Sequence, residues 1–221
     1  VTNALWNATT VILVSLMGIF YFDEKFTIYQ YFGLGFAVLA IIFIDVRGFT
    51  TISEQLSAEK VVSLLNTHFS NVIKIVTKYG GEIDKFIGDA ALCVFGLNED
   101  SNPASNAALA AIEIVNSTRE SDQTFIDQNL PPIRCVAGVN YGKAIAGNIG
   151  SNDRLEFTVI GDSVNIAARL EGITKELKKD VVISDAVFQK LSTEQQQLFT
   201  SEGEHPIRGK EKGILLYGHI N

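Results

Sequence analysis

Along most of the chain, short continuous apolar runs alternate with stretches in which apolar residues recur every three or four positions. Short β-branched runs, such as residues 39–45, are typical of buried strands. Between these runs lie stretches with an apolar residue every three or four positions, which predicts helices that bury one face. This alternation of strands, hairpins and helices predicts an α+β sandwich, with helices packed on one mostly antiparallel sheet.

Boundary signals place the individual elements. Ser57 is a favoured cap for a helix that continues to about residue 79. Two closely spaced apolar runs predict a hairpin over residues 81–95, with Asp89 at or beside its turn. A second turn is expected at Tyr141-Gly142, between two strands. The same signals predict helices at residues 102–119, 162–177 and 186–191, and strands at residues 133–140, 143–149, 157–160, 181–184 and 214–219.

The first 44 residues differ from the rest because they carry only three charged side chains, Asp23, Glu24 and Lys25. These divide two uncharged runs, each close to the roughly 20 apolar residues that a helix needs to cross a bilayer. The pattern predicts an apolar helical hairpin. One alternative is a signal peptide, but the segment has no basic n-region and no clear small-residue cleavage site. The other alternative is a buried helical hairpin of a soluble protein.

The chain is therefore divided into an apolar hairpin at residues 1–39 and a second domain at residues 40–221. Membrane association is expected through residues 4–39, with the second domain in the cytoplasm. The second apolar run and the first strand share residues 39–44, so both cannot form in full. We expect the hairpin to be either short and interfacial or, preferably, the remnant of a fusion or truncation.

The apolar segment resembles the last two helices of a small multidrug resistance transporter. The resemblance is carried by ALW at residues 4–6, VILVSLMGIFYF at residues 11–22 and IYQYFGLGFAVLAIIFI at residues 28–44. The first helix of that family carries the glutamate that binds drug and proton, and nothing here corresponds to it. Transport is therefore not expected.

Composition narrows the possible functions. A net charge of −7 argues against a nucleic-acid partner, because such proteins normally present a basic stripe. Two cysteines, Cys93 and Cys135, exclude a disulfide scaffold. The mean hydropathy of +0.20 is high for a chain with 19% charged residues, and it belongs mostly to the N-terminal segment.

Two aspartates stand at the edges of predicted buried elements, where each alone is most simply a cap or turn residue. Asp45 ends an apolar strand and Asp89 lies in a glycine-flanked turn. If the two converge, hard carboxylates without histidine or cysteine favour Mg²⁺ or Mn²⁺. Asp45 is followed closely by Gly48, Phe49 and Thr50, where the glycine allows the backbone to approach a phosphate.

Two further groups are candidates for binding. Asn165 and Arg169 are four residues apart on one predicted helix, so they share a face and could hold a ribose and a phosphate. A helix-surface pair is the simpler interpretation. Arg208 opens the basic segment RGKEK, which is either a solvated turn or an anion contact.

Taken together, the second domain resembles the class III nucleotidyl cyclase catalytic domain, of the adenylyl type. Five motifs carry the resemblance in the order of the family: FIDVRGFTTISE, GGEIDKFIGDA, NYGKAIAGNIGS, FTVIGDSVNIAARLE and IRGKEKG. They cover roughly residues 40–220. The resemblance implies a ferredoxin-like βαββαβ domain with extra strands.

The resemblance also implies a role for each candidate residue. Asp45 and Asp89 look like the ligands of two Mg²⁺ or Mn²⁺ ions, with the Val46 carbonyl as a further ligand. Asn165 would orient the ribose, and Arg169 would stabilise charge on the α-phosphate. The remaining nucleotide contacts implied are Gly48, Phe49 and Thr50 at the phosphates, Lys85 and Thr158 at the purine, and Arg208 at the triphosphate, where the family has lysine.

Lys85 and Thr158 resemble the adenylyl type, because guanylyl cyclases typically carry glutamate and cysteine there. The implied reaction converts ATP to 3′,5′-cyclic AMP and pyrophosphate by in-line attack of the ribose 3′-hydroxyl. The family forms each active site between two subunits, so a homodimer is expected. The alternatives are a guanylyl cyclase and a non-catalytic membrane protein that carries a cyclase fold.

Overall fold

The structure is a computed structural model and describes residues 35–98, 102–151, 154–208 and 212–219. Its strands are β1 (Gly35–Val46), β2 (Glu82–Ile87), β3 (Ala90–Phe95), β4 (Cys135–Ser151), β5 (Arg154–Ile160), β6 (Val181–Ser184), β7 (Phe199–His205) and β8 (Ile214–His219). Its helices are α3 (Phe49–Glu54), α4 (Ala58–Lys78), α5 (Pro103–Glu120), α6 (Asp122–Asp127), α7 (Asp162–Leu177), α8 (Asp185–Phe188) and α9 (Thr193–Gln196).

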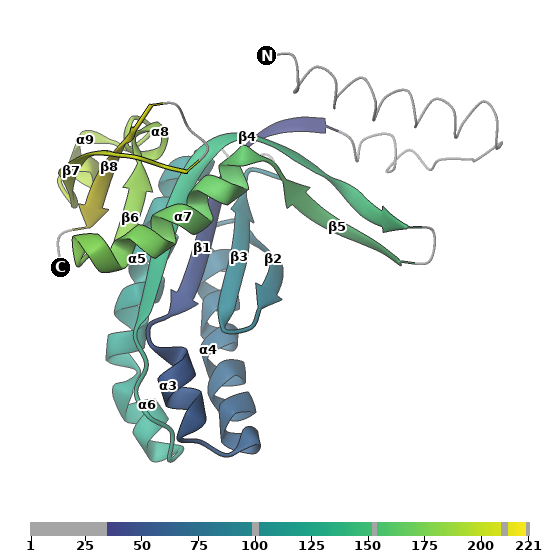
Figure 1. The fold of residues 1–221 in the computed structure, drawn as a ribbon, viewed down its shortest axis with the longest axis vertical. Coiled ribbons are helices and arrows are strands. Elements are labelled where there is room, and N and C mark those ends of the chain that lie inside the picture. Colours follow the sequence, from purple (N-terminus) through teal and green to yellow (C-terminus); the bar gives the residue numbers. More distant parts are fainter. Residues whose placement is uncertain (1–34, 99–101, 152–153, 209–211, 220–221) are drawn as a thin grey trace.

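The strands form one sheet in the order β2-β3-β1-β4-β6-β8-β7, and β5 pairs with the second half of β4 (Figure 1). Within it, β1, α4, β2, β3, α5 and β4 give the spatial strand order β4-β1-β3-β2. This is the predicted ferredoxin-like arrangement, to which β5 to β8 are added. All neighbouring strands are antiparallel except β4 and β6.

Helices cover both faces of the sheet, with α4 and α5 on one side and α7 on the other (Figure 1). Ile42 and Ile44 of β1 pack with α4 and α5, whereas Leu39 and Ile41 join a cluster that includes Ala167 of α7. Because β1 is buried on both faces, its sequence is a continuous apolar run rather than an alternating one.

The helix and hairpin predictions are largely confirmed. The Ser57 side chain accepts a hydrogen bond from the Lys60 backbone N–H and caps α4. Helix α7 begins and ends at the predicted residues. Strands β2 and β3 form the expected hairpin, and Gly88 in its turn has φ of 65°, a conformation that glycine adopts without strain.

The N-terminal prediction is wrong for the part that the structure describes. Residues 35–38 were expected in a helix, but they belong to β1, which pairs with β4 from Gly35↔Ala146 onward. An apolar run without polar interruptions fits a buried strand as well as a helix, so the sequence pattern could not separate them. The rest of the predicted hairpin, residues 1–34, lies outside the described residues, and no helix among those described is long and apolar enough to cross a membrane.

The turn predicted at Tyr141-Gly142 is also wrong, because β4 runs through both residues without a break. They pair with Ala40 and Leu39 of β1. Gly142 has a different role: a Cβ there would lie 2.5 Å from the Ser163 Oγ at the start of α7, so this hydroxyl would have to move. The glycine therefore marks a close approach between strand and helix.

Buried His68 on α4 gives a prediction about stability. Its ring lies 3.6 Å from the Cys135 Sγ, and burial lowers its pKa from 6.5 to about 4, against a smaller opposing effect of Asp89. The unfolded state binds the His68 proton more tightly than the folded state does. The contribution of His68 to the free energy of unfolding is therefore fully present above pH 6.5 and is lost as pH falls toward 4. Between pH 7 and 5 the wild-type protein should lose about 2 kcal/mol more unfolding free energy than His68→Leu. Urea unfolding at both pH values measures this, and equal losses in the two proteins would contradict it.

Candidate active site

Strand β1 brings the two predicted metal-binding aspartates together. Asp45 lies next to the last residue of β1, and Asp89 lies in the β2–β3 turn. Because β1 pairs with β3 at Ile44↔Ala91, the end of β1 and this turn lie at the same edge of the sheet. The two carboxyl groups are close enough to share a hydrogen bond.

Their proximity has an electrostatic consequence. The pKa of Asp45 is raised from 3.8 to about 7. Burial is the largest cause, followed by the hydrogen bond with Asp89, the charge of Asp89 and the charge of Glu171. Glu171 is a half-buried residue of α7, and its own pKa is raised by burial and by Asp89 and lowered by Arg47. Close carboxylates disfavour joint ionisation, so a proton or a cation must compensate their charge. A divalent cation would do this better than a shared proton.

The donor set fits Mg²⁺ or Mn²⁺. These ions take hard oxygen ligands, and Mg²⁺ is usually held by one or two carboxylates together with water and substrate phosphates. Asp45, Asp89 and the adjacent Val46 carbonyl match that description. In the part of the chain that the structure describes, no group of three or more His, Cys, Asp or Glu side chains is arranged to enclose a metal by itself.

The segment after β1 is held by a charged contact that the sequence did not reveal. The Arg47 backbone N–H donates to the Arg134 carbonyl at 2.8 Å, and its guanidinium donates to Asp180 Oδ1 at 3.1 Å. Asp180 also binds Arg119 of α5. Gly48 then takes φ of 71°, a left-handed conformation that strains other residues, and α3 begins at Phe49 with Thr50 next.

The two predicted purine contacts also lie together, on β2 and β5. They meet through Asp84, whose side chain is only 3% exposed. Its Oδ2 accepts from the Thr158 hydroxyl at 2.9 Å, and its Oδ1 accepts from the Val159 backbone N–H at 3.2 Å. The Lys85 ammonium lies 3.7 Å from Asp84 Oδ2 and 3.2 Å from Glu156 Oε1.

Sequence reasoning missed Asp84 because it treated the hairpin as regular. Ile83 pairs with Cys93 and Lys85 with the next residue, Leu92, so Asp84 is an extra residue in a β-bulge. A bulge redirects the side chains around it. The only available signal was the position of Asp84 beside Lys85 inside the motif GGEIDKFIGDA.

The third group of predicted residues lies on and beside α7. Asn165 is exposed and Arg169 half-buried, one helical turn apart as expected. The Arg169 guanidinium donates to the backbone carbonyl of Arg208, which brings these two residues together. A guanidinium has five N–H donors, so this contact leaves donors for a phosphate.

Three groups of predicted residues therefore form within one chain: the aspartates with the segment after β1, the Lys85–Thr158 pair, and the α7 group. Among the described residues, no hydrogen bond or ion pair connects one group to another. A reaction that needs all three groups must bring them together in another way.

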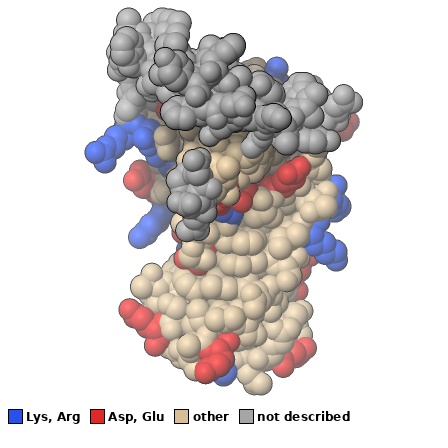
Figure 2. Space-filling model, turned by 90° about the vertical axis from the view of Figure 1, so that its right-hand side faces the viewer, with Lys and Arg blue, Asp and Glu red and all other residues tan. Residues whose placement is uncertain are grey.

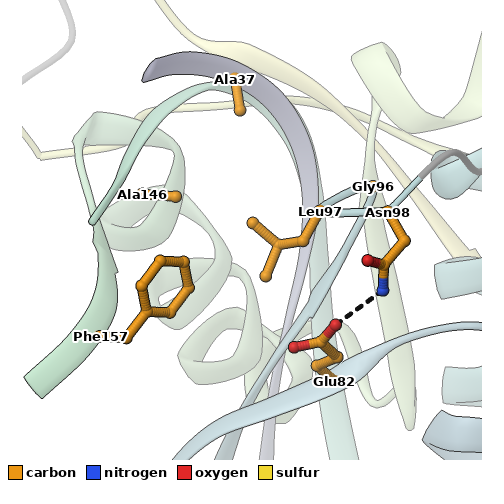
Figure 3. A pocket seen from close by; sticks show the side chains of 7 residues that line it. All are labelled: Ala37, Glu82, Gly96, Leu97, Asn98, Ala146 and Phe157. Carbon is orange, nitrogen blue, oxygen red and sulfur yellow. Dashed lines mark hydrogen bonds between the residues drawn. The ribbon is translucent and has the colours of Figure 1, made fainter. Parts of the chain in front are cut away.

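A cavity of about 340 Å³ lies between β1, β4 and β5 and is lined by none of the predicted site residues. Figure 3 shows Leu97 and Phe157 directed toward its interior, with the Asn98 amide donating to Glu82 at 2.7 Å along one wall. Its lining is completed by Ala37, Gly96 and Ala146. Phe157 precedes Thr158 on β5, but side chains of consecutive strand residues point to opposite faces, and the cavity is lined by neither Lys85 nor Thr158.

The family follows from a match that spans most of the chain. The model of the adenylate and guanylate cyclase catalytic domain matches residues 35–218. The chain belongs to this family. The cyclase domain is 34% identical over 185 residues to an adenylate cyclase of Anabaena cylindrica, covering 81% of this chain and 36% of that one. It is 33% identical over 176 residues to adenylate cyclase 1 of Rhizobium meliloti, covering 79% and 26%.

Solved structures agree with this assignment. The adenylyl cyclase CyaB from P. aeruginosa has a TM-score of 0.75 at 29% identity and covers 85% of this chain and 95% of its own. The guanylyl cyclase Cya2 gives the same TM-score and identity, with 85% and 93% coverage. The cyclase domain spans about a third or less of the first curated relatives. Since likeness to the two kinds of structure is equal, base specificity depends on individual residues.

The aspartate pair leads to a prediction about metal binding. Asp45→Asn keeps the shape of the side chain but removes one of the two charges, so Mn²⁺ affinity in the presence of a non-cyclisable ATP analogue should fall at least about tenfold. Electron paramagnetic resonance of Mn²⁺ measures the bound fraction. Asp122→Asn is the matched control, because Asp122 lies on α6 and its carboxylate pairs with Arg134 rather than with Asp89. Equal Mn²⁺ binding by wild type and Asp45→Asn would show that this pair does not hold the metal.

Proposed function

We propose that the chain is the catalytic domain of an adenylyl cyclase, which converts ATP to 3′,5′-cyclic AMP and pyrophosphate between two copies of itself. The observation that carries the choice of ATP is the pairing of Lys85 and Thr158 through Asp84. Adenine N1 accepts a hydrogen bond and its 6-amino group donates one. An ammonium donor beside a hydroxyl matches that pattern, whereas guanine presents the opposite pattern at both positions.

The chemistry follows from the three groups of residues. The ribose 3′-hydroxyl releases its proton to solvent water and its oxygen attacks the α-phosphorus. The bond between the α-phosphorus and the oxygen that bridges to the β-phosphorus breaks, and pyrophosphate leaves. Bound between Asp45 and Asp89, divalent cations would supply Lewis-acid activation of the 3′-hydroxyl and neutralise phosphate charge. Arg169 stabilises charge that develops on the α-phosphate, Asn165 orients the ribose, and Arg208 holds the triphosphate.

Assembly as a homodimer explains how the separate groups act together. In a symmetric pair, the aspartates of one subunit face Asn165, Arg169 and Arg208 of the other, and two equivalent sites result. Apolar side chains on β2 and β5 support such an interface, since Phe86, Leu155 and Phe157 are all at least 40% exposed. Figure 2 views the side of the molecule that bears these strands and shows that much of this face is uncharged, with Asp and Glu side chains gathered at its lower end.

The activity prediction is direct. Purified protein with Mn²⁺ and ATP should form cyclic AMP, and Arg169→Ala should lower kcat by at least about a hundredfold because it removes transition-state charge stabilisation. Parallel initial rates with GTP distinguish the adenylyl from the guanylyl alternative. A faster rate with GTP would overturn the base assignment, and equal activity of wild type and Asp45→Asn would show that the reaction does not use the aspartate pair. No product with either nucleotide would favour a non-catalytic cyclase fold.

A second prediction tests the shared site. Asp45→Asn and Arg169→Ala should each be inactive alone, yet a mixture should recover about a quarter of wild-type activity, since half of the dimers are mixed and each has one intact site. The mixture is assayed after co-refolding or co-expression, with total protein held constant. No recovery in a mixture shown by mass spectrometry to contain mixed dimers would place the complete site within one chain.

A further inference from the structure

Asp84 is a buried carboxylate for which the proposed reaction gives no role. It lies at the β2 bulge, beside Lys85, and is only 3% exposed. Both of its oxygens accept hydrogen bonds, one from the Val159 N–H and one from the Thr158 hydroxyl. A backbone N–H can only donate, so Asp84 Oδ1 must act as an acceptor.

These contacts fix the proton of the Thr158 hydroxyl. A hydroxyl carries one hydrogen and two lone pairs, so it can either donate to a ligand or accept from it. Here the hydrogen is committed to Asp84 Oδ2 at 2.9 Å. Thr158 is itself buried, with 7% exposure, so water competes little for this contact. What remains for a ligand is a lone pair.

We infer that Asp84 is a specificity-determining residue: by holding the Thr158 proton, it makes this hydroxyl a fixed acceptor that admits a 6-amino purine and rejects a 6-oxo purine. The inference rests on the proposed function, because it assumes that Lys85 and Thr158 contact the base. Without Asp84, the threonine hydroxyl could rotate and donate to the 6-oxygen of guanine as readily as it accepts from adenine. Lys85 alone cannot separate the two bases, since an ammonium can also donate to a 6-oxygen.

The isosteric variant Asp84→Asn reverses this polarity. Its amide oxygen continues to accept from the Val159 N–H, so its NH₂ group faces the Thr158 oxygen and donates to it. The opposite amide orientation would bring two N–H donors together at Val159. The Thr158 proton is then released toward the purine, where it can donate to a 6-oxo group.

The experiment compares ATP with inosine triphosphate, which carries an oxygen at position 6 and lacks the 2-amino group of GTP. In Asp84→Asn, the ratio of kcat/KM for ATP to that for inosine triphosphate should fall about tenfold or more. Thr158→Val should lower the same ratio, and adding Asp84→Asn to Thr158→Val should lower it no further. Competition of both nucleotides against a fluorescent ATP analogue gives the comparison without turnover.

The matched control is Glu156→Gln, which removes the other carboxylate beside Lys85 without touching Thr158. It should change KM for the two nucleotides in parallel and leave their ratio within about twofold. A structural role of Asp84 alone would lower activity toward both nucleotides equally. An unchanged ratio in Asp84→Asn, in a protein that prefers ATP, would therefore overturn the inference while the cyclase function stands. Selective ATP binding without cyclic AMP formation would overturn the cyclase function while the inference about Asp84 stands. A wild-type preference for 6-oxo nucleotides would overturn the adenylyl cyclase function and the inference together.

Discussion

Strand β1 is the constraint on which the rest of the structure depends. It pairs along its length with β4 on one side and with β3 on the other, and it is buried on both faces. These pairings place Asp45 beside the β2–β3 turn that carries Asp89. They also position β4, which in turn holds β5 and Thr158. The aspartate pair and Thr158 are therefore fixed relative to β1 by backbone hydrogen bonds, whereas the α7 group is held by the packing of α7 on the sheet.

The position of β1 in the sheet explains how the two carboxyl groups of Asp45 and Asp89 can be held close together. A rigid sheet can hold two carboxylates in contact although they repel, because the cost is distributed over many hydrogen bonds and buried side chains. With a net charge of −7, the chain has no overall attraction for an anionic nucleotide. If the proposed nucleotide binds, cations held by Asp45 and Asp89, together with Lys85 and the arginines of the α7 group, would supply a local positive field that the net charge does not describe.

Much of this arrangement could be read from the sequence, and the failures have physical causes. Motifs identified the candidate residues because short polar groups at the ends of apolar strands leave a clear pattern. Gly142 was misread because a glycine in a turn and a glycine beneath a helix look the same in one dimension. Asp84 and Asp180 were missed because their roles depend on partners far away in the chain, Thr158 and Arg47. Spacing along the chain carries no record of such contacts.

The uninterrupted course of β4 also has a mechanical meaning. Its residues Ile145 and Ala146 pair with Phe36 and Gly35 at the start of β1 and, on the other side, with Ile160 and Val159 of β5. Two hydrogen-bond ladders thus join the chain entering the domain to the strand that carries Thr158. A force applied at residue 35 would therefore reach the predicted purine contacts through the backbone hydrogen bonds of β4, without passing through the aspartate pair. The start of β1 and the position of Thr158 are mechanically coupled in this fold.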